Sequence, residues 1–481
     1  MKTPTRTQRR LRPAPIGFPS RVETQRLYDD ADLNRAVQAY RFFYPTVSGA
    51  AIFKGNEAIG LMPNKIFGVM DSKPHHVGFT LNSDTPYGPA MLDLNVGPFV
   101  IELPAGPLIV VAMDVNQRWV ADMGIVGPEA GCGARHLLLP PGFSGVAPHG
   151  FHVWQCESNR VLVAIRSVPV GGDVRGALDR IKTVNVHPLI PTADWREPKW
   201  LNLTPVPQDT TPLIWEKNIE FWKALDEVIQ SDPPIADYRD YYGELAALGI
   251  VKGKQFAPDE RMTRILEQAA KIGIAQMRTQ SFADRRPDRV VWSDRRWEWV
   301  GLREEDGDFN AASYVDLDAR EVWFYQAIGA SPAMFRRKAG VGSLYWLGLR
   351  DRDDAYLDGG DTYRLSVPLP VPCKLFWSVT VYDAETRSQI QTDQGRAALR
   401  SLFELKDAPG ATSVDLFFGP ARPQVADESR WIKTIPGKGW FAYFRVYGPD
   451  EGAFDGSWKP GDFERIGELD HQAAVDSRFA R

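Results

Sequence analysis

The sequence predicts a mainly β fold with α-helices, in which two strand-rich regions flank a helical middle region. Three observations predict it. Residues 80–170 form short runs of β-branched and aromatic residues cut by Gly and Pro, residues 175–340 space their apolar residues as helices do, and strand-like runs return at 360–450. The frequent turns of the first region favour an antiparallel sandwich over a parallel sheet of βαβ units.

The length of the chain implies more than one domain. At 481 residues it exceeds what one ordinary hydrophobic core holds together. With 43% hydrophobic and 25% charged residues, its composition is that of a soluble globular protein. We place a disordered basic tail at 1–20, a helix plus a β-sandwich domain at 21–200, a helical middle domain at 201–345 and a strand-rich C-terminal domain at 346–481.

Each predicted element depends on a local pattern. Apolar spacing predicts a helix over 22–44, and we expect Pro45 to end it. A second helix is capped by Thr211 and stops at Asp232, a third follows Asp259, and a fourth spans 318–330. The predicted strands are 99–103, 108–114, 118–123, 151–155, 161–168, 362–367, 374–382, 413–418 and 440–447.

Charge and cysteine content exclude several classes of protein. A net charge of −4 gives no general attraction to nucleic acids or anionic membrane surfaces, so we expect neither as a partner. The basic N-terminus lacks the apolar run of a signal peptide, and no stretch approaches the ~18 apolar residues that cross a bilayer. We therefore expect a cytoplasmic protein without a membrane span. The three cysteines, Cys132, Cys156 and Cys373, are expected to be reduced thiols, with a Cys132–Cys156 bridge as the alternative.

The most promising polar group of residues is the turn at 81–88 (LNSDTPYG). In an extended stretch Asn82 and Asp84 lie on the same face, so their amide and carboxylate can converge on one ligand or one proton. Tyr87 can reach the same space across the bend between them. If burial shifts the carboxyl pKa, this group can act as a general acid or base. The alternative is that Asn82 and Asp84 only hydrogen-bond their own backbone to form a turn.

Four further residues complete the predicted site. Asp122 and His75 are candidate catalytic groups, and Arg118 and Trp119 are candidate ligand-binding groups, provided that the strand at 118–123 pairs near the turn. A second distinctive segment, 376–383 (FWSVTVYD), alternates as a half-buried strand does. Its aromatic residues are therefore expected in the core rather than on a ligand platform.

The sequence lacks the usual metal and cofactor motifs. His149 and His152 lie three residues apart, an offset that points side chains to opposite faces of a strand, and no His-x-His spacing occurs. We predict no metal site, although convergence of His136, His149 and His152 through a turn stays open. Because no nucleophile elbow, Walker loop or dinucleotide loop occurs, no organic cofactor is predicted.

Seven segments carry a family resemblance, and they occur in the order 32–40, 82–87, 97–100, 358–365, 376–383, 444–449 and 458–460. Together they resemble a bacterial family named for two domains of unknown function, numbered 1254 at the N-terminal side and 1214 at the C-terminal side. The resemblance implies two β-sandwich domains, the second a jelly roll at 346–481, joined by a helical middle domain. It also implies assembly into a homotrimer. The chain departs from the family at Gly88, where a small hydroxyl residue is expected, at 431–433 (WIK), and in its missing export signal.

Two functions from different classes follow. The first is an enzyme without an organic cofactor that acts on a small hydrophobic or aromatic molecule by acid–base hydrolysis or elimination; the 15 Trp, 15 Tyr and 24 Phe and the Asn82 turn motivate it. The second is a non-catalytic trimeric binding or shell-forming protein, because jelly-roll domains readily assemble. A buried polar pocket at Asn82, Asp84 and Tyr87 would favour the enzyme. We favour the enzyme because the chain is expected in the cytoplasm.

Overall fold

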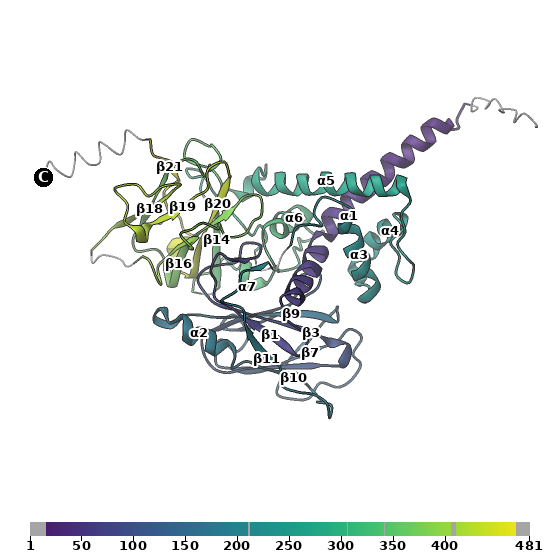
Figure 1. Ribbon diagram of the computed structural model, residues 1–481, viewed down its shortest axis with the longest axis horizontal. Helices are drawn as coiled ribbons and strands as arrows, with labels where there is room; N and C mark the ends of the chain where they lie inside the picture. Colours follow the sequence, from purple (N-terminus) through teal and green to yellow (C-terminus); the bar gives the residue numbers. More distant parts are fainter. Residues whose placement is uncertain (1–15, 210–211, 305, 341, 406–409, 468–481) are drawn as a thin grey trace, which may run out of the picture.

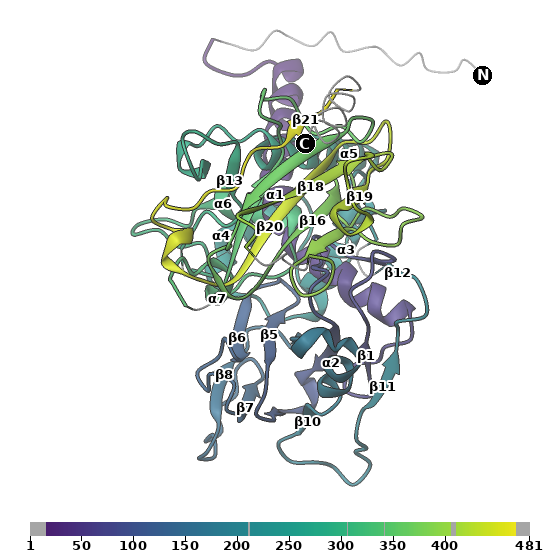
Figure 2. The same ribbon diagram turned by 90° about the vertical axis from the view of Figure 1, so that its left-hand side faces the viewer.

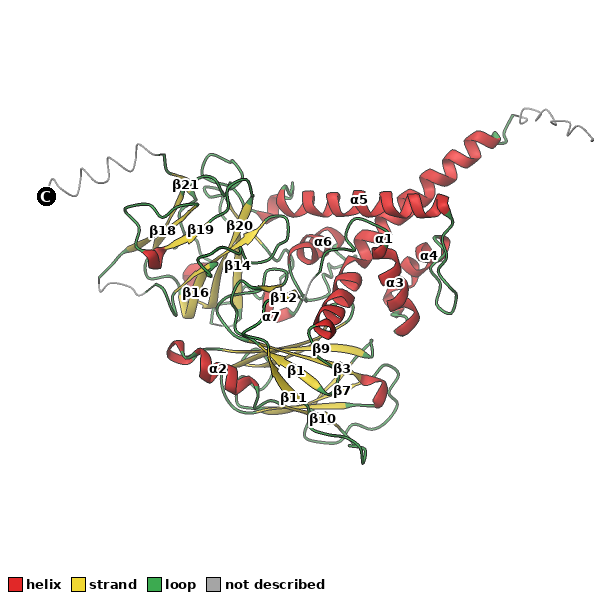
Figure 3. Cartoon of the chain, viewed as in Figure 1, coloured by secondary structure: helices red, strands yellow, loops and turns green. Residues whose placement is uncertain are grey.

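Seven α-helices and several β-sheets make up the described part of the chain, so the predicted combination of sheets with helices is confirmed in its coarse form. Figure 1 shows the strands of the first half at the bottom, the C-terminal strands at the upper left and the long helices at the upper right. Figure 3 shows the same view coloured by element type. The predicted tail lies largely outside the described residues. The computed structural model describes residues 16–209, 212–304, 306–340, 342–405 and 410–467.

Two four-stranded sheets form the N-terminal strand-rich region. The antiparallel sheet has the order β3 (Tyr87–Asp93), β9 (Arg160–Ser167), β5 (Leu108–Asp114), β6 (Trp119–Gly124). The other has the order β10 (Asn185–Pro188), β4 (Phe99–Leu103), β7 (Ala134–Leu139), β8 (His152–Gln155), and only β7 and β8 run parallel. Helix α2 (Val174–Ile181) and two parallel pairs complete the region: β1 (Ile66–Val69) with β11 (Lys199–Asn202), and β2 (His76–Val77) with β12 (Gln208–Asp209).

Side-chain alternation explains how these two sheets pack. Val110 on β5 and Val163 on β9 are fully buried, and they share one hydrophobic core with Ile101 on β4 and Leu138 on β7. Alternate residues of β3, β5 and β9 point to the opposite face of their sheet. That second face belongs to the candidate site.

The helices pack around the long first helix. An aromatic-rich core that includes Tyr40, Trp222 and Tyr325 joins them. None of the helices in the described residues is both long and apolar enough to cross a membrane. The helices are α1 (Arg21–Ala58), α3 (Glu220–Ser231), α4 (Arg239–Ala247), α5 (Glu260–Phe282), α6 (Leu317–Gln326) and α7 (Pro332–Phe335). Short 3-10 turns occupy Leu94–Val96, Val170–Gly172, Ala236–Tyr238, Pro287–Arg289, Glu428–Arg430 and Glu451–Ala453.

The prediction that Pro45 ends the first helix is wrong, because α1 continues to Ala58. A proline inside a helix removes one backbone hydrogen bond. The segment that follows it is buried on nearly every side, and this packing outweighs the lost bond. At Gly49 an added Cβ would lie 2.0 Å from the carbonyl oxygen of Val115, so glycine permits the close approach of α1 to the turn between β5 and β6.

The second predicted helix starts later than expected. Its predicted cap, Thr211, lies outside the described residues, and α3 begins at Glu220. Residues 214–218 form turns instead of helix. The side chain of Asn218 accepts the backbone N–H of Glu220 at 2.9 Å, which is an Asx turn just before the helix. This irregular lead-in places Glu216 in the core, where it pairs with a buried arginine.

Two further sheets form the C-terminal strand-rich region. The larger has the order β13 (Trp297–Trp299), β14 (Ser343–Gly348), β20 (Trp440–Pro449), β16 (Cys373–Asp383), β17 (Ala398–Arg400) and is antiparallel throughout. The smaller has the order β19 (Trp431–Lys433), β18 (Ser413–Gly419), β15 (Tyr363–Pro368), β21 (Glu464–Arg465), with β18 and β19 parallel. Figure 2 shows the long strands of these sheets side by side.

Strand β20 is buried on both faces along its whole length. Ala442, Phe444 and Val446 point into the core that the two C-terminal sheets share. The alternate residues include Tyr443 and Arg445, which point to the other side of the sheet. That side carries polar and aromatic groups and meets the N-terminal region, so the candidate site lies between two sheet faces.

Candidate functional site

A pocket of about 150 Å³ lies where the N-terminal and C-terminal strand-rich regions meet. Its walls are mostly apolar, with a few polar groups grouped among them. From the N-terminal region it is lined by Met70, Phe79, Thr80, Leu81, Asn82, Tyr87, Pro89, Val111, Met113, Leu162, Ala164 and Arg166. From the helices and the C-terminal sheet it is lined by Ile52, Asn56, Trp323, Ala327, Ile328, Met334, Tyr345, Tyr443 and Arg445.

The floor of the pocket follows from strand alternation. On β9, Leu162, Ala164 and Arg166 line the pocket, whereas Val163 and Ile165 between them are buried in the sheet-to-sheet core. The same alternation holds on β3 and β5. The period-two pattern therefore gives this sheet two different faces, and the arginine stands on the pocket face.

The opposite wall comes from the C-terminal sheet. Tyr345 on β14 is paired in register with Arg445 on β20, and Arg445 is paired with Ser378 on β16. The ring faces of Tyr443, Tyr382 and Tyr345 lie 4.9, 5.4 and 5.6 Å from the Arg445 guanidinium carbon. Aromatic faces attract cations, so this tyrosine set stabilises a buried arginine.

Asn82 forms the predicted turn and also links the two strand-rich regions. Its side-chain carbonyl accepts the backbone N–H groups of Asp84 at 2.9 Å and Thr85 at 3.2 Å, which is an Asx turn. Its amide nitrogen donates to the hydroxyl of Tyr447 on β20 at 2.9 Å. The Asn82 backbone N–H donates to the Tyr87 hydroxyl at 3.3 Å. Asn82 and Tyr87 both line the pocket, as the predicted site requires.

Asp84 is buried beside the pocket and does not line it. One carboxylate oxygen accepts the hydroxyl of Ser378 at 2.9 Å, and the other has no partner among the described residues. Burial raises the pKa of Asp84 above its ordinary value, and the positive charge of Arg445 and two other arginines offsets this only in part. Asp84 therefore does more than fix its own turn, since its carboxylate is engaged across the domain boundary.

Arg445 and Arg166 bring positive charge to the pocket. Arg445 is buried and donates to the Thr80 carbonyl at 2.9 Å, while its Nη1 has no partner among the described residues. Arg166 donates to the Thr85 hydroxyl at 2.9 Å and to the Tyr447 hydroxyl at 3.3 Å. Its guanidinium carbon lies 5.4 Å from the ring centre of Tyr87.

Asp122 lies on β6 outside the pocket lining. One carboxylate oxygen accepts the backbone N–H of Ala333 at 3.2 Å, and the other has no partner among the described residues. Burial raises the pKa of Asp122 to about 6, and the hydrogen bond from the Ala333 backbone offsets part of that shift. Its register partner on β5 is Val111, a pocket residue, so Asp122 lies on the same face of the sheet as the pocket, one strand beyond its lining.

The predicted ligand-binding pair lies elsewhere. Arg118 lines a second hollow of about 280 Å³, where it is ion-paired with Glu157 and lies 3.6 Å from Asp308. The Trp119 ring packs edge to face with Trp154, with ring centres 5.9 Å apart. Neither side chain lines the pocket that contains Asn82 and Tyr87.

His75 joins a separate polar group. His75 Nε2 lies 3.1 Å from the Thr204 carbonyl, and His76 Nε2 lies 3.0 Å from Asp71. Asp71, His75 and His76 form the one group within the described residues whose three ligand atoms lie within 4.8 Å of one another. The Lys73 ammonium is 3.1 Å from Asp71, so positive charge already faces this carboxylate. These are the residues that could hold a metal.

The other histidines and cysteines fall outside that group. His136 is buried and lies 3.2 Å from Glu129, and its ring centre is 5.1 Å from that of His152 on the neighbouring strand. His149 is exposed. Cys132 and Cys156 are free thiols in the structure, the first exposed and the second buried. Burial raises the pKa of Cys156 to about 12, which makes it a poor nucleophile.

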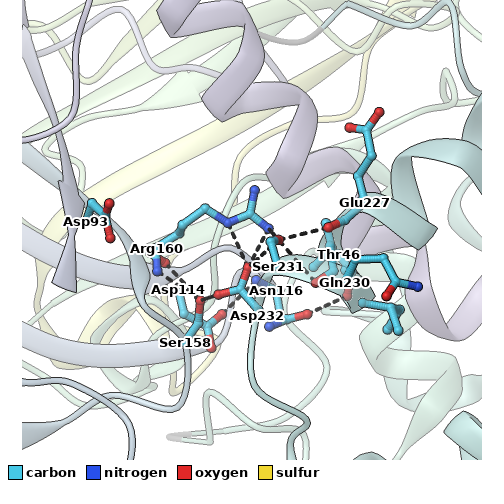
Figure 4. Close-up of polar contacts among 12 residues, drawn as sticks. Thr46, Asp93, Asp114, Asn116, Ser158, Arg160, Glu227, Gln230, Ser231 and Asp232 are labelled. Atoms are coloured by element: carbon cyan, nitrogen blue, oxygen red, sulfur yellow. Dashed lines mark hydrogen bonds and ion pairs between the residues drawn. The ribbon is translucent and has the colours of Figure 1, made fainter. Parts of the chain in front are cut away.

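A second polar cluster joins the N-terminal sheet to the helices (Figure 4). Asp232, at the end of α3, accepts from the Ser158 hydroxyl and from Arg160 Nε at 2.7 Å. Asp114 accepts the backbone N–H of Asn116 at 2.8 Å, and burial raises the pKa of Asp114 to about 7. The contacts are internal and largely satisfied, so this cluster ties elements together.

Sequence reasoning found the Asn82 turn and missed the two arginines and Tyr447. A signal was present, because Arg166 and Arg445 are single charges within otherwise apolar runs of sequence (VLVAIRS and WFAYFRVYG). Charged residues are rarely buried unless they are paired, so a charge within a buried strand indicates a specific role. The pairing of these two distant strands around one pocket is a tertiary feature that no local pattern encodes.

Two family models match the chain. One, described as "Protein of unknown function (DUF1254)", matches residues 67–188, and the other, described as "Protein of unknown function (DUF1214)", matches residues 342–451. The predicted domain pair and its order are confirmed. The pocket takes Asn82, Tyr87 and Arg166 from the first segment and Tyr345 and Arg445 from the second.

A solved structure shows a similar fold. The VPA0106 protein from Vibrio parahaemolyticus matches with a TM-score of 0.57 and 17% identity, over 91% of this chain and 100% of that chain. An uncharacterized protein from Burkholderia cenocepacia has a TM-score of 0.40 and 13% identity, over 92% and 96% of the two chains. A search of the curated proteins finds no match. The first similarity shows that the fold as a whole recurs.

Proposed function

The chain belongs to the family of proteins that carry a DUF1254 domain followed by a DUF1214 domain, and we propose that it is an enzyme with its substrate pocket between them. The substrate is a small hydrophobic or aromatic molecule. The reaction is an acid–base hydrolysis or elimination that uses no organic cofactor. The observation that carries the proposal is the apolar pocket of about 150 Å³ with Asn82 and Tyr87 in its wall.

The pocket has the features of a small-molecule site. Such sites are concave, mostly apolar and furnished with a few polar groups, and they are common at domain boundaries. A dry apolar cavity of about 150 Å³ is large enough to hold benzene. The walls here include Phe79, Trp323 and Leu162, so they suit a flat or branched apolar molecule of that order of size.

The polar end of the pocket supplies groups for proton transfer. The Tyr87 hydroxyl stands in the wall, with the Asn82 backbone N–H 3.3 Å from it and the Arg166 cation near its ring. Asp84 lies one turn away with a raised pKa, which brings its carboxyl closer to the pH at which it exchanges a proton. We propose that Tyr87 contacts the substrate and that the charge of Asp84 adjusts the electrostatic potential at this end of the pocket.

Ligand binding is tested by a thermal-shift screen of the purified protein against a broad metabolite library. A ligand at about 100 times its Kd stabilises by roughly 2.7 kcal/mol, which such a screen detects. Ala164→Phe would fill the pocket from β9 and should abolish the shift. The matched control is Val153→Phe, at a strand position 42% exposed and outside the pocket, which should bind normally.

Catalysis is tested with Tyr87→Phe once a substrate is found. This variant keeps the ring and removes only the hydroxyl, so binding should persist while the rate falls by about 10²–10⁴, as expected for loss of a general acid or base. Unchanged turnover would remove Tyr87 from the mechanism and leave the pocket as a binding site.

A second proposal is a non-catalytic homotrimer that binds or forms shells. Its support is the first part of α1, which extends beyond the end of α5 (Figure 1) and exposes Val22, Leu27 and Tyr28. In this proposal each strand-rich region is a β-sandwich, the second a jelly roll, and the protein is cytoplasmic. Light scattering coupled to size exclusion tests it, since a monomer that turns over substrate excludes it.

A further inference from the structure

The charges around the pocket do not balance. Its lining contains the guanidinium groups of Arg166 and Arg445 and no carboxylate. Neither arginine forms a salt bridge within the described residues. The acidic group that both arginines act on is Asp84, which does not line the pocket and is also affected by the positive charge of Arg400. Arg400 has its own partner, Glu404, so the pocket retains an excess of positive charge.

One of these arginines has donor capacity that the protein leaves unused. Arg445 is 3% exposed, and its Nη1 has no hydrogen-bond partner among the described residues. Its direct contacts are the Thr80 carbonyl and the faces of three tyrosines, which are neutral groups, and the carboxylate that attracts it is Asp84, with which it forms no salt bridge. An unsatisfied buried donor on a charged group is costly, and such atoms are normally paired. A ligand acceptor in the pocket would complete this site.

We infer that the ligand of this pocket is a small organic acid, with an apolar body against the walls and a carboxylate against Arg445 and Arg166. The inference rests on the proposed function, because it names the class of molecule that the pocket takes. Guanidinium groups bind carboxylates through paired N–H donors in a plane, a match that a neutral amide or a cation does not offer. The pocket volume limits the body to about one ring or a chain of similar size.

The position of the two arginines sets the orientation of the acid. Arg166 stands on β9 of the N-terminal sheet and Arg445 on β20 of the C-terminal sheet, so the carboxylate would lie near the junction of the two sheets. Asn82 and Tyr87 lie at the same end, because Arg166 lies 5.4 Å from the Tyr87 ring centre and shares the Tyr447 hydroxyl with Asn82. The body would then extend between Leu162 and Trp323, toward the apolar part of the pocket.

The test uses matched pairs of acid and primary amide on the full-length protein: benzoate and benzamide, phenylacetate and phenylacetamide, hexanoate and hexanamide. Binding is measured by isothermal titration calorimetry at neutral pH. For at least one pair the acid should bind about tenfold or more tighter than its amide. Arg445→Gln should remove this preference, and Arg166→Gln provides a second variant if the first does not fold. Arg337→Gln is the control, since Arg337 lies over Trp299 outside the pocket.

Each outcome decides one of the two proposals. A preference for the acid that Arg445→Gln or Arg166→Gln removes, and that Arg337→Gln leaves intact, supports the inference. Equal binding of acid and amide overturns it and leaves the proposed function standing, since the pocket then takes a neutral molecule. If no pair binds to the folded wild-type protein, the acid inference is overturned, and a neutral hit in the library screen would still support the pocket.

Discussion

Replacing Arg387 with methionine should destabilise the protein strongly, because this arginine is the centre of a buried ionic network. Arg387 is 1% exposed and Glu216, its ionic partner, is 4% exposed. Arg387 also donates to the hydroxyl of Tyr44 on α1 at 3.0 Å and to the carbonyl of Glu385 at 2.7 Å. The substitution would leave the Glu216 carboxylate buried without its cation.

The expected magnitude follows from that burial. Removing one partner of a buried ion pair costs about 3–5 kcal/mol, because the other charge is left unpaired. The double variant Arg387→Met with Glu216→Gln removes both charges, so its cost should be less than the sum of the single costs by about 1–3 kcal/mol. The matched control is the Lys54–Glu227 pair, which joins α1 to α3 with side chains 57% and 59% exposed. An exposed pair should show a coupling of about 0–1 kcal/mol.

Urea unfolding followed by the fluorescence of the 15 tryptophans measures all of these variants. Additive costs for Arg387→Met and Glu216→Gln would refute the reasoning, as would equal coupling in the exposed Lys54–Glu227 pair. The network also reaches the site, since the backbone carbonyl of Arg387 accepts the N–H of Thr80 at 2.8 Å. Ligand binding should therefore weaken in Arg387→Met even where the protein stays folded.

Three further predictions concern the site and its surroundings. Burial raises the pKa of Asp84, so the neutral Asp84→Asn should keep or raise the melting temperature at pH 8 while it abolishes turnover; a lower melting temperature with full turnover would make the residue structural. Burial raises the pKa of Asp114 to about 7, above the unfolded value of about 3.9, so the folded state holds a proton that the unfolded state has lost. Stability should thus fall as pH rises from about 4 to 7, and urea midpoints of Asp114→Asn should lack that slope. Gly49→Ala places a Cβ 2.0 Å from the Val115 carbonyl oxygen and should cost about 1–3 kcal/mol in the same unfolding assay, whereas no loss would show that α1 can move.

Local patterns were sufficient for most strands and for the caps of some helices. The predicted strands 99–103 and 108–114 have the bounds of β4 and β5, and Asp259 caps α5 by accepting the Met262 N–H at 2.7 Å. These features depend on residues adjacent in sequence. The end of α1 depended on tertiary packing, because burial of the residues after Pro45 outweighs the low helix propensity of proline.

The site was predictable only in part, because one of its walls also depends on tertiary packing. Asn82 and Tyr87 lie in one turn, and a polar turn beside a strand can be recognised from sequence. The opposite wall comes from residues about 290 to 365 positions later, as the bonds from Ser378 to Asp84 and from Asn82 to Tyr447 show. Arg118 and Trp119 were placed in the site on the assumption that their strand pairs near the turn, but β6 pairs with β5 on the far side of the sheet from β3.

The turn at residues 79–85 lines the pocket and also contacts the C-terminal sheet, so the shape of the pocket depends on that contact. Its backbone carbonyls are held by C-terminal side chains: Tyr382 donates to Leu81 at 2.8 Å and Arg400 donates to Ser83 at 2.6 Å. Its side chains reach the same sheet through Asn82. A movement of one sheet relative to the other would break these hydrogen bonds and would also change the position of one pocket wall relative to the other. A ligand that bridges Arg166 and Arg445 therefore contacts both sheets, and by linkage its binding energy also stabilises their association.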